Sequence, residues 1–153
     1  ENLLAAIAEE GFQILTNQVE QIKENSPKDS LESLFKIAVL YIQFGSDYPE
    51  YYKLMFGGII KKAENYPNLF AASTKSYNTF KSLIDELIQS KKLLVTANSN
   101  LMTFYSWSLL HGLVSLAQDN RLNIAFVEAN NDNPQKLMEE LFSYFLQGVI
   151  NRE

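Results

Sequence analysis

The sequence predicts an all-α protein that folds as one bundle of about six helices over residues 1–153. Apolar residues recur at steps of three and four along most of the chain, which places them on single faces of helices. Proline, glycine and asparagine interrupt these periodic segments at positions typical of helix ends. The only run that resembles a β-strand is Leu-Leu-Val at 93–95, which is too short to carry a sheet. A chain of this length can bury a substantial core as a single domain.

The first helix is predicted over residues 1–24, where Leu4, Leu15 and Val19 belong to one apolar face. The polar run Asn-Ser-Pro at 25–27 ends it. No capping residue precedes this helix, and helices rarely begin uncapped at a natural terminus. We therefore expect the sequence to start inside a longer chain.

The second helix is predicted over residues 30–44 and carries a broad apolar stripe. Asp29 followed by Glu32 has the spacing of a capping box, which would open the helix. Gly45 and Ser46 are expected to stop it.

Prolines open the third and fourth helices. The third starts at Pro49 and ends at the glycine pair 57–58, after which residues 59–66 form an irregular or short helical connector. The fourth begins at Pro67 and ends at the positively charged Ser-Lys-Lys run 90–92. A short connector then leads to the fifth helix.

The stretch 98–118 contains no Asp, Glu, Lys or Arg and holds the only tryptophan and the only histidine of the chain. A helix that is apolar nearly all round must be buried on nearly all sides. It is either the central helix of an ordinary bundle, or a helix that packs on its own domain along one side and on a second subunit along the other. A membrane span is not favoured, because the stretch carries many polar side chains and no flanking Lys/Arg cluster.

The C-terminal part consists of a polar segment and a last helix. Residues 119–133 read as a loop, with a short helical turn predicted around 124–126. Asn133 and Pro134 form a cap and first-turn pair that opens a helix extending to Ile150.

Composition and charge exclude several classes of function. A net charge of −5 without clustered Lys and Arg argues against nucleic-acid binding by these residues. The absence of cysteine from the sequence excludes disulfides and thiolate chemistry and favours a cytoplasmic location. With one histidine, zinc and di-iron patterns fail, and no cofactor is predicted. A catalytic triad that uses His111 would lack a Gly-x-Ser-x-Gly elbow, and haem ligation by His111 alone has no support, so we do not predict an enzyme.

Three segments together resemble the C-terminal domain of tetracycline-repressor-like (TetR-family) transcriptional regulators, in the variant named for a Trp-His-Gly motif. They are YPEYYKLMFG at 48–57, WSLLHGL at 107–113, and the opening ENLLAAIAEEGF at 1–12. Tyr48 stands where that group usually has histidine. The order and spacing of the segments agree with the family over essentially the whole chain, but its N-terminal helix-turn-helix domain is absent.

The resemblance implies a ligand-sensing and dimerisation domain. A small, mostly apolar or amphipathic effector would enter between the middle helices and move the first helix, which would change the spacing of two DNA-binding domains across a homodimer. The chain would contact DNA only through the missing N-terminal domain, and it would not contact a membrane. Two other classes stay open, namely a stand-alone helical interaction module and a small-molecule carrier or enzyme on a helical bundle.

Aromatic and sulfur-containing side chains are concentrated in the middle helices, where they either fill a core or line a ligand pocket between helices. The residues predicted to bind ligand are Tyr41, Phe44, Tyr52, Met55, Tyr77, Phe80, Phe104, Trp107 and His111. For His111 we favour a neutral imidazole bonded to a backbone carbonyl or a neighbouring hydroxyl over direct ligand contact.

The implied dimer would form through the helices 98–118 and 134–150, packed against their symmetry mates as a four-helix bundle. Small residues on the first of these helices would allow close approach, and apolar residues on the last would supply area. The predicted interface residues are Ser108, Gly112, Ser115, Leu141, Phe145 and Val149.

Overall fold

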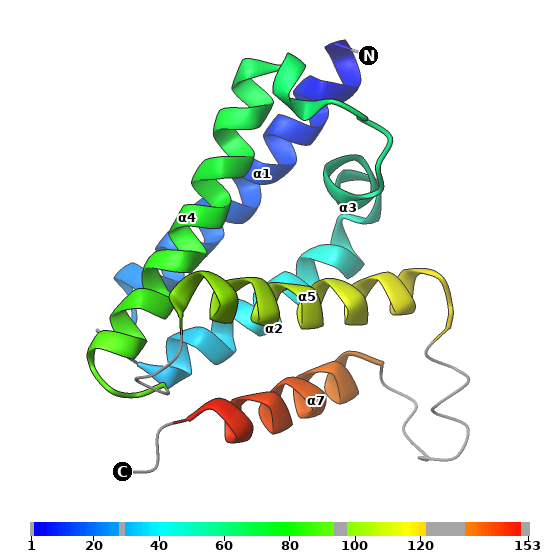
Figure 1. Ribbon diagram of the computed structural model, residues 1–153. Coiled ribbons are helices and arrows are strands. Elements are labelled where there is room, and N and C mark those ends of the chain that lie inside the picture. Colours follow the sequence, from blue (N-terminus) through cyan, green and yellow to red (C-terminus); the bar gives the residue numbers. More distant parts are fainter. Residues whose placement is uncertain (1, 28–29, 94–97, 122–133, 151–153) are drawn as a thin grey trace.

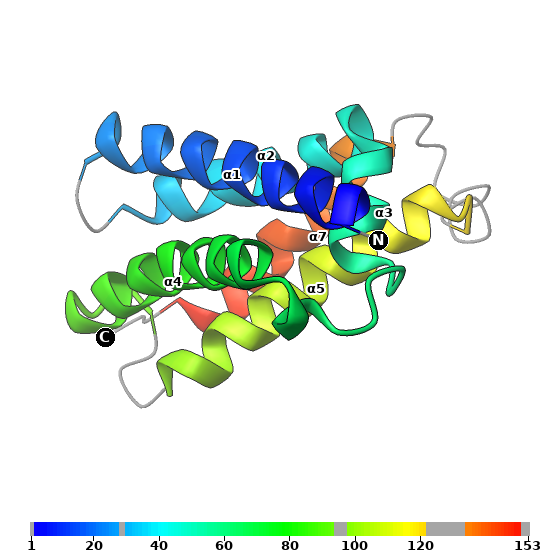
Figure 2. The ribbon, with the colours of Figure 1, turned by 90° about the horizontal axis from the view of Figure 1, so that it is seen from above.

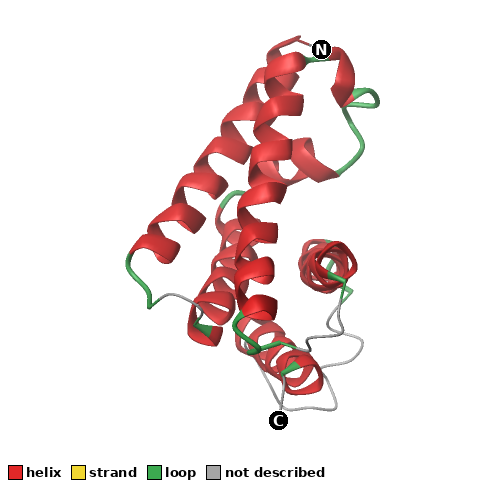
Figure 3. Ribbon diagram, turned by 60° about the vertical axis from the view of Figure 1, so that its left-hand side comes forward, coloured by secondary structure: helices red, strands yellow, loops and turns green. Residues whose placement is uncertain are grey.

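The structure, a computed structural model, describes residues 2–27, 30–93, 98–121 and 134–150. Its long helices are α1 (Asn2–Glu24), α2 (Leu31–Asp47), α4 (Pro67–Gln89), α5 (Ser99–Gln118) and α7 (Pro134–Val149). The shorter elements are α3 (Pro49–Phe56) and the 3-10 turn η1 (Ala63–Asn65). No strand occurs in these residues, where Leu93 and Ile150 form one isolated antiparallel bridge (Figure 3). The predicted all-α bundle is confirmed.

Helices α1, α3 and α4 lie on one side of α2 and α5, and α7 lies on the other side. Helices α1 and α4 lie side by side and run in the same direction, as Figures 1 and 2 both show. Helix α5 crosses the end of α4 and packs on α2, and α7 lies against α2 and α5 on the other side. Helix α3 contacts α1 and α2, so α1 is covered by three other helices.

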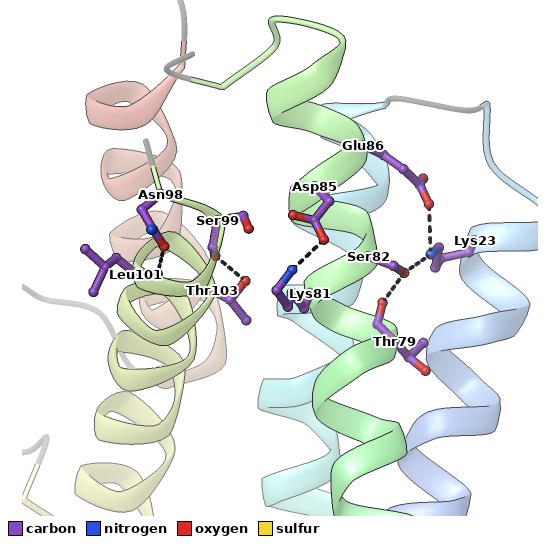
Figure 4. A network of polar contacts seen from close by, with 10 residues as sticks. All are labelled: Lys23, Thr79, Lys81, Ser82, Asp85, Glu86, Asn98, Ser99, Leu101 and Thr103. Atoms are coloured by element: carbon purple, nitrogen blue, oxygen red, sulfur yellow. Dashed lines mark hydrogen bonds and ion pairs between the residues drawn. The ribbon is translucent and has the colours of Figure 1, made fainter. Parts of the chain in front are cut away.

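Two groups of polar contacts hold α1 against α4. The ammonium of Lys23 donates to Ser82 Oγ at 2.6 Å and lies 3.3 Å from Glu86 Oε1 (Figure 4). Lys75 Nζ lies 3.1 Å from Glu20 Oε1 further along the same pair of helices. Exposed ion pairs of this kind contribute at most about 1 kcal/mol each, so the apolar contacts between the two helices supply most of the stability.

Two predictions about α2 are wrong. The N-cap is Ser30, whose Oγ accepts from the backbone N–H of Glu32 at 3.1 Å, and Asp29 lies outside the described residues. The helix also continues past Phe44 to Asp47. The reason is the role of Gly45: a Cβ there would lie 2.3 Å from Val114 Cγ1. This glycine permits close packing of α2 on α5 and does not end the helix.

Replacement of Gly45 by alanine is expected to lower the free energy of unfolding by about 1–3 kcal/mol, because the stiff Val114 side chain must move. Gly148→Ala is the matched control, since a Cβ at Gly148 meets nothing within 4 Å. Urea unfolding compares the two variants with the wild type. Equal midpoints for both variants would contradict the packing role of Gly45.

Other helix ends agree with the sequence. Pro49 and Pro67 occupy the first turns of α3 and α4, and the backbone of Gly58 has a φ of 71° in the break after α3. Asn98 caps α5 by accepting from the Leu101 N–H at 3.2 Å. The turn predicted around 124–126 and the cap at Asn133 lie outside the described residues.

Within one chain, α5 is not buried on all sides, which corrects the expectation from its composition. One face packs in the core, whereas large apolar side chains on the other face are exposed. The exposed residues are Leu101 (70%), Phe104 (58%), Tyr105 (58%) and Leu116 (47%), joined by Tyr144 (69%) and Leu141 (38%) of α7. Among the helices of the described residues, none has the length and apolar character that crossing a membrane requires.

Candidate functional site

A cavity of about 410 Å³ lies among helices α1 to α5. This volume is within the range of small-molecule sites, about 300–1,000 Å³. Five helices and the connector between α3 and α4 contribute to its wall. The lining residues are Phe12, Leu15, Val19, Ile37, Tyr41, Leu54, Met55, Phe56, Ile60, Ala63, Leu69, Ser73, Thr74, Ser76, Tyr77, Phe80, Trp107 and Leu110.

Helical periodicity and one close helix contact place these side chains. Phe12, Leu15 and Val19 recur at three- and four-residue steps, so they share one face of α1. The backbone of Gly11 approaches α3 so closely that a Cβ would lie 2.5 Å from Met55 Sδ. Helix α3 can therefore present Met55 and Phe56 to the cavity next to α1.

Most of the cavity wall is apolar, and one side of it carries hydroxyl groups. None of its described lining residues is an Asp, Glu, Lys, Arg or His. The hydroxyl groups come mainly from one segment of α4, which contributes Ser73, Thr74, Ser76 and Tyr77. Burial of an unpaired charge in such surroundings costs several kcal/mol or more. The cavity is thus suited to a neutral, largely apolar molecule.

A chain of polar contacts begins at the cavity wall and leads away from it. Trp107 Nε1 donates to the Tyr41 hydroxyl at 3.2 Å, and both residues line the cavity. The Tyr41 hydroxyl lies 3.3 Å from that of Tyr52, which in turn lies 2.6 Å from His111 Nδ1. The rings of Tyr52 and His111 are stacked, with centroids 5.5 Å apart. The contacts therefore connect α2, α3 and α5.

Burial keeps all the groups of this network neutral. It raises the pKa of Tyr41 well above the ordinary value, and a nearby Tyr52 raises it further. It also raises the pKa of Tyr52 to about 12. The pKa of His111 is lowered from 6.5 because burial disfavours the imidazolium. At neutral pH the network consists of two phenols, an indole and an uncharged imidazole.

The lowered pKa of His111 predicts a stability that decreases in acid. The unfolded chain takes up a proton at this residue at a higher pH than the folded chain, so stability is complete above pH 6.5 and falls as the pH drops through that value. The wild type should lose more unfolding free energy than His111→Gln between roughly pH 7.5 and roughly pH 5.5. Urea titrations at both pH values measure the difference. A parallel loss in the two proteins would contradict the burial of a neutral His111.

Comparison with protein families identifies a family for this chain. Residues 34–141 match the family described as tetracyclin repressor-like, C-terminal domain. The chain belongs to this family. Among solved structures, a protein of unknown function from Rhodococcus sp. RHA1 is similar with a TM-score of 0.79 and 19% sequence identity. That match covers 97% of this chain and 73% of the other, and at this identity it supports the fold. The search of curated proteins returned no match.

In this tetracycline-repressor-like domain, the structure brings five of the predicted ligand-binding residues to the cavity wall. They are Tyr41, Met55, Tyr77, Phe80 and Trp107. As ligand contacts they remain predictions.

The other four predicted residues do not line the cavity. Phe44 is buried in the main core, and the side chain of Phe104 is 58% exposed on α5. Tyr52 and His111 belong to the network behind Tyr41. The preferred interpretation of His111, a neutral imidazole bonded to a neighbouring hydroxyl, agrees with its contact to Tyr52.

Sequence reasoning missed most of the aliphatic wall. Leu15, Val19, Ile37 and Leu110 carry no signal that separates a cavity wall from a core, because both require apolar residues at helical spacing. Phe56 belongs to the same aromatic-rich segment as Met55 and contacts the rings of Tyr52, Trp107 and His111. Its position next to Met55 in this segment was the signal that could have placed Phe56 among the predicted ligand-binding residues.

The residues predicted for a dimer interface differ in exposure. Ser108 is exposed, Gly112 and Ser115 are half-buried, and Leu141 is 38% exposed. Val149 is only 7% exposed and packs in the core of its own chain, so it has little area to offer a partner.

The remaining predicted interface residue, Phe145, is half-buried and packs on Tyr105 with ring centroids 5.0 Å apart. The exposed apolar side chains Leu101, Phe104, Tyr105, Leu116 and Tyr144 were not predicted as interface residues.

Proposed function

We propose that this domain is the ligand-sensing and dimerisation part of a tetracycline-repressor-like transcriptional regulator. Its ligand is a small, neutral and mostly apolar molecule held in the cavity among α1 to α5. The observation that carries the proposal is the wall of that cavity, which is large enough for a ligand and whose described residues have no ionisable acid or base apart from tyrosine hydroxyls. Such a wall can hold a ligand, but its described residues offer no carboxylate, imidazole or amine for catalysis, so we propose no enzymatic activity.

Helix α1 is the proposed route by which occupancy of the cavity is transmitted. Phe12, Leu15 and Val19 contribute to the wall, so a ligand that fits one position of α1 better than another shifts the helix between them. DNA contact belongs, in this proposal, to a separate N-terminal domain, and the location is the cytoplasm. If ligand binds without any displacement of α1, a carrier function becomes the better account.

The exposed apolar faces of α5 and α7 support the dimer. Six large apolar side chains on these two helices are between 38% and 70% exposed, whereas most of the other apolar residues that the structure describes pack inside. Apolar patches of this kind mark interaction surfaces. Two copies that pair these faces around a twofold axis would bury them in a four-helix bundle.

A matched pair of fluorescent probes tests the ligand site. N-phenyl-1-naphthylamine is neutral, and 8-anilino-1-naphthalenesulfonate has nearly the same aromatic body with a sulfonate added. We expect saturable binding of the neutral probe, with energy transfer from Trp107. The anion should bind at least about tenfold more weakly, because none of the described lining residues carries a positive charge. Absence of saturable binding of the neutral probe, or equal affinity for both, would contradict the proposed site.

A further inference from the structure

The network at the cavity wall sets the hydrogen-bonding character of the side of the cavity that Tyr41 and Trp107 form. Of the residues in this network, Tyr41 and Trp107 line the cavity. The hydroxyl oxygen of Tyr41 lies 3.2 Å from Trp107 Nε1, 3.3 Å from the Tyr52 hydroxyl and 3.4 Å from His111 Nδ1. Its hydroxyl has one proton to donate and two lone pairs to accept with. Which of these remains unused depends on the direction of each hydrogen bond in the network.

The shortest contact in the network indicates that direction. Tyr52 Oη and His111 Nδ1 are 2.6 Å apart. Hydrogen bonds donated by N–H span about 2.7–3.2 Å, whereas those donated by O–H reach down to about 2.5 Å. A contact this short fits an O–H donor, so we assign the hydroxyl of Tyr52 as the donor and Nδ1 as the acceptor, which places the proton of the neutral imidazole on Nε2. The neutral state agrees with the half-buried position of His111.

The remaining bonds follow in order. The single lone pair of Nδ1 is occupied by Tyr52, so the Tyr41 proton is directed to the oxygen of Tyr52 at 3.3 Å. One lone pair of the Tyr41 oxygen accepts from Trp107 Nε1, which can only donate. Each group thus donates to the next, from Trp107 through Tyr41 and Tyr52 to His111. Tyr41 keeps one unused lone pair and no free proton.

We propose that the ligand of this cavity carries a hydrogen-bond donor, an alcohol, phenol or N–H group, which it donates to the oxygen of Tyr41. This inference rests on the proposed ligand-binding function and narrows the class of ligand. Tyr41 is the residue that determines this specificity. An ether or ester oxygen at the same position would face the lone pair of Tyr41 and leave both groups unsatisfied, a state that is costly when buried.

The test compares 4-pentylphenol with its methyl ether, 4-pentylanisole, which keeps the apolar body and the oxygen but lacks the donor. Affinities are measured from Trp107 fluorescence for the wild type, for Tyr41→Phe, and for Tyr48→Phe as a matched substitution outside the cavity wall. The ratio of the two affinities is compared between proteins, so differences in the hydration of the probes cancel. We expect Tyr41→Phe to reduce the preference for the phenol by about three- to tenfold and Tyr48→Phe to leave it unchanged.

The outcomes separate this inference from the function on which it rests. Binding of both probes with a ratio unaffected by Tyr41→Phe overturns the donor requirement and leaves the apolar site in place. Failure of the wild type to bind either probe overturns both. If Tyr41→Phe is too unstable to test, nitrogen-15 NMR of the single histidine decides the direction of the network in the wild type. A protonated Nδ1 would make His111 the donor to Tyr52, would release the Tyr41 proton for a ligand, and would overturn the inference, whereas a protonated Nε2 supports it.

Discussion

Replacement of Gly112 on α5 by leucine is expected to turn the proposed dimer into a monomer without unfolding the chain. A Cβ at Gly112 meets nothing within 4 Å in its own chain, so a larger side chain has room in the protomer. The neighbouring exposed Ser108 and half-buried Ser115 lie on the same side of the helix, where small residues allow a second helix to approach. A leucine would hold the two helices apart, and twofold symmetry introduces the obstruction twice.

We expect the dimer dissociation constant to rise about 100-fold or more for Gly112→Leu, the size of effect seen at the centre of an interface. Gly112→Ala adds a single methyl group and serves as the size control, with a much smaller effect. Light scattering over a concentration series measures the association, and circular dichroism checks that the helices persist. A Gly112→Leu variant that stays dimeric would remove this face of α5 from the interface.

Replacement of Ser76 on α4 by tryptophan is expected to weaken ligand binding strongly while leaving the fold intact. Ser76 lines the cavity, and an indole at this position would occupy space that the ligand needs. Binding of N-phenyl-1-naphthylamine, measured from the probe's own emission, should weaken by at least about tenfold. The free energy of unfolding should stay unchanged or rise by about 0.5–2 kcal/mol, because a filled cavity stabilises a core.

Asn78→Trp is the matched control, since Asn78 lies on the same helix two residues further on and is exposed. It should bind the probe like the wild type. Unchanged binding by Ser76→Trp would place the probe outside the cavity. A loss of binding together with a loss of unfolding free energy would show damage to the fold, and would count against the cavity as an open, rigid site.

The helices were predictable because the signals that define them are local. Proline in the first turn indicated the starts of α3 and α4. Asn98 caps α5 because its side-chain oxygen can accept a hydrogen bond from a backbone N–H of the first turn. Gly45 was misread because a glycine that ends a helix and one that admits a neighbouring helix look the same in sequence. Only the position of Val114, 69 residues later in the chain, separates the two roles.

The site was predictable only in part, because a cavity is a property of several helices at once. Tyr41, Met55 and Trp107 were found because large or polar-tipped side chains are conspicuous in an apolar helix. Phe44 has the same character but lies in the main core and not at the cavity wall. Three residues at about 100° each place it only roughly 60° from the direction of Tyr41, so helical spacing alone could not separate the two. The exposed side of α5 could not be distinguished from its buried side, because both are apolar.

The most direct measurement of the central claim is NMR with the methyl groups of the chain labelled, in the presence of 4-pentylphenol. If a neutral apolar ligand occupies the cavity, intermolecular contacts will appear to the methyl groups of Leu15, Ile37 and Leu110, which line it on three different helices. Methyl groups of the exposed Leu116 and Leu141 will show none. Contacts confined to Leu116 and Leu141 would show that the probe covers the outer apolar face, and would contradict the account.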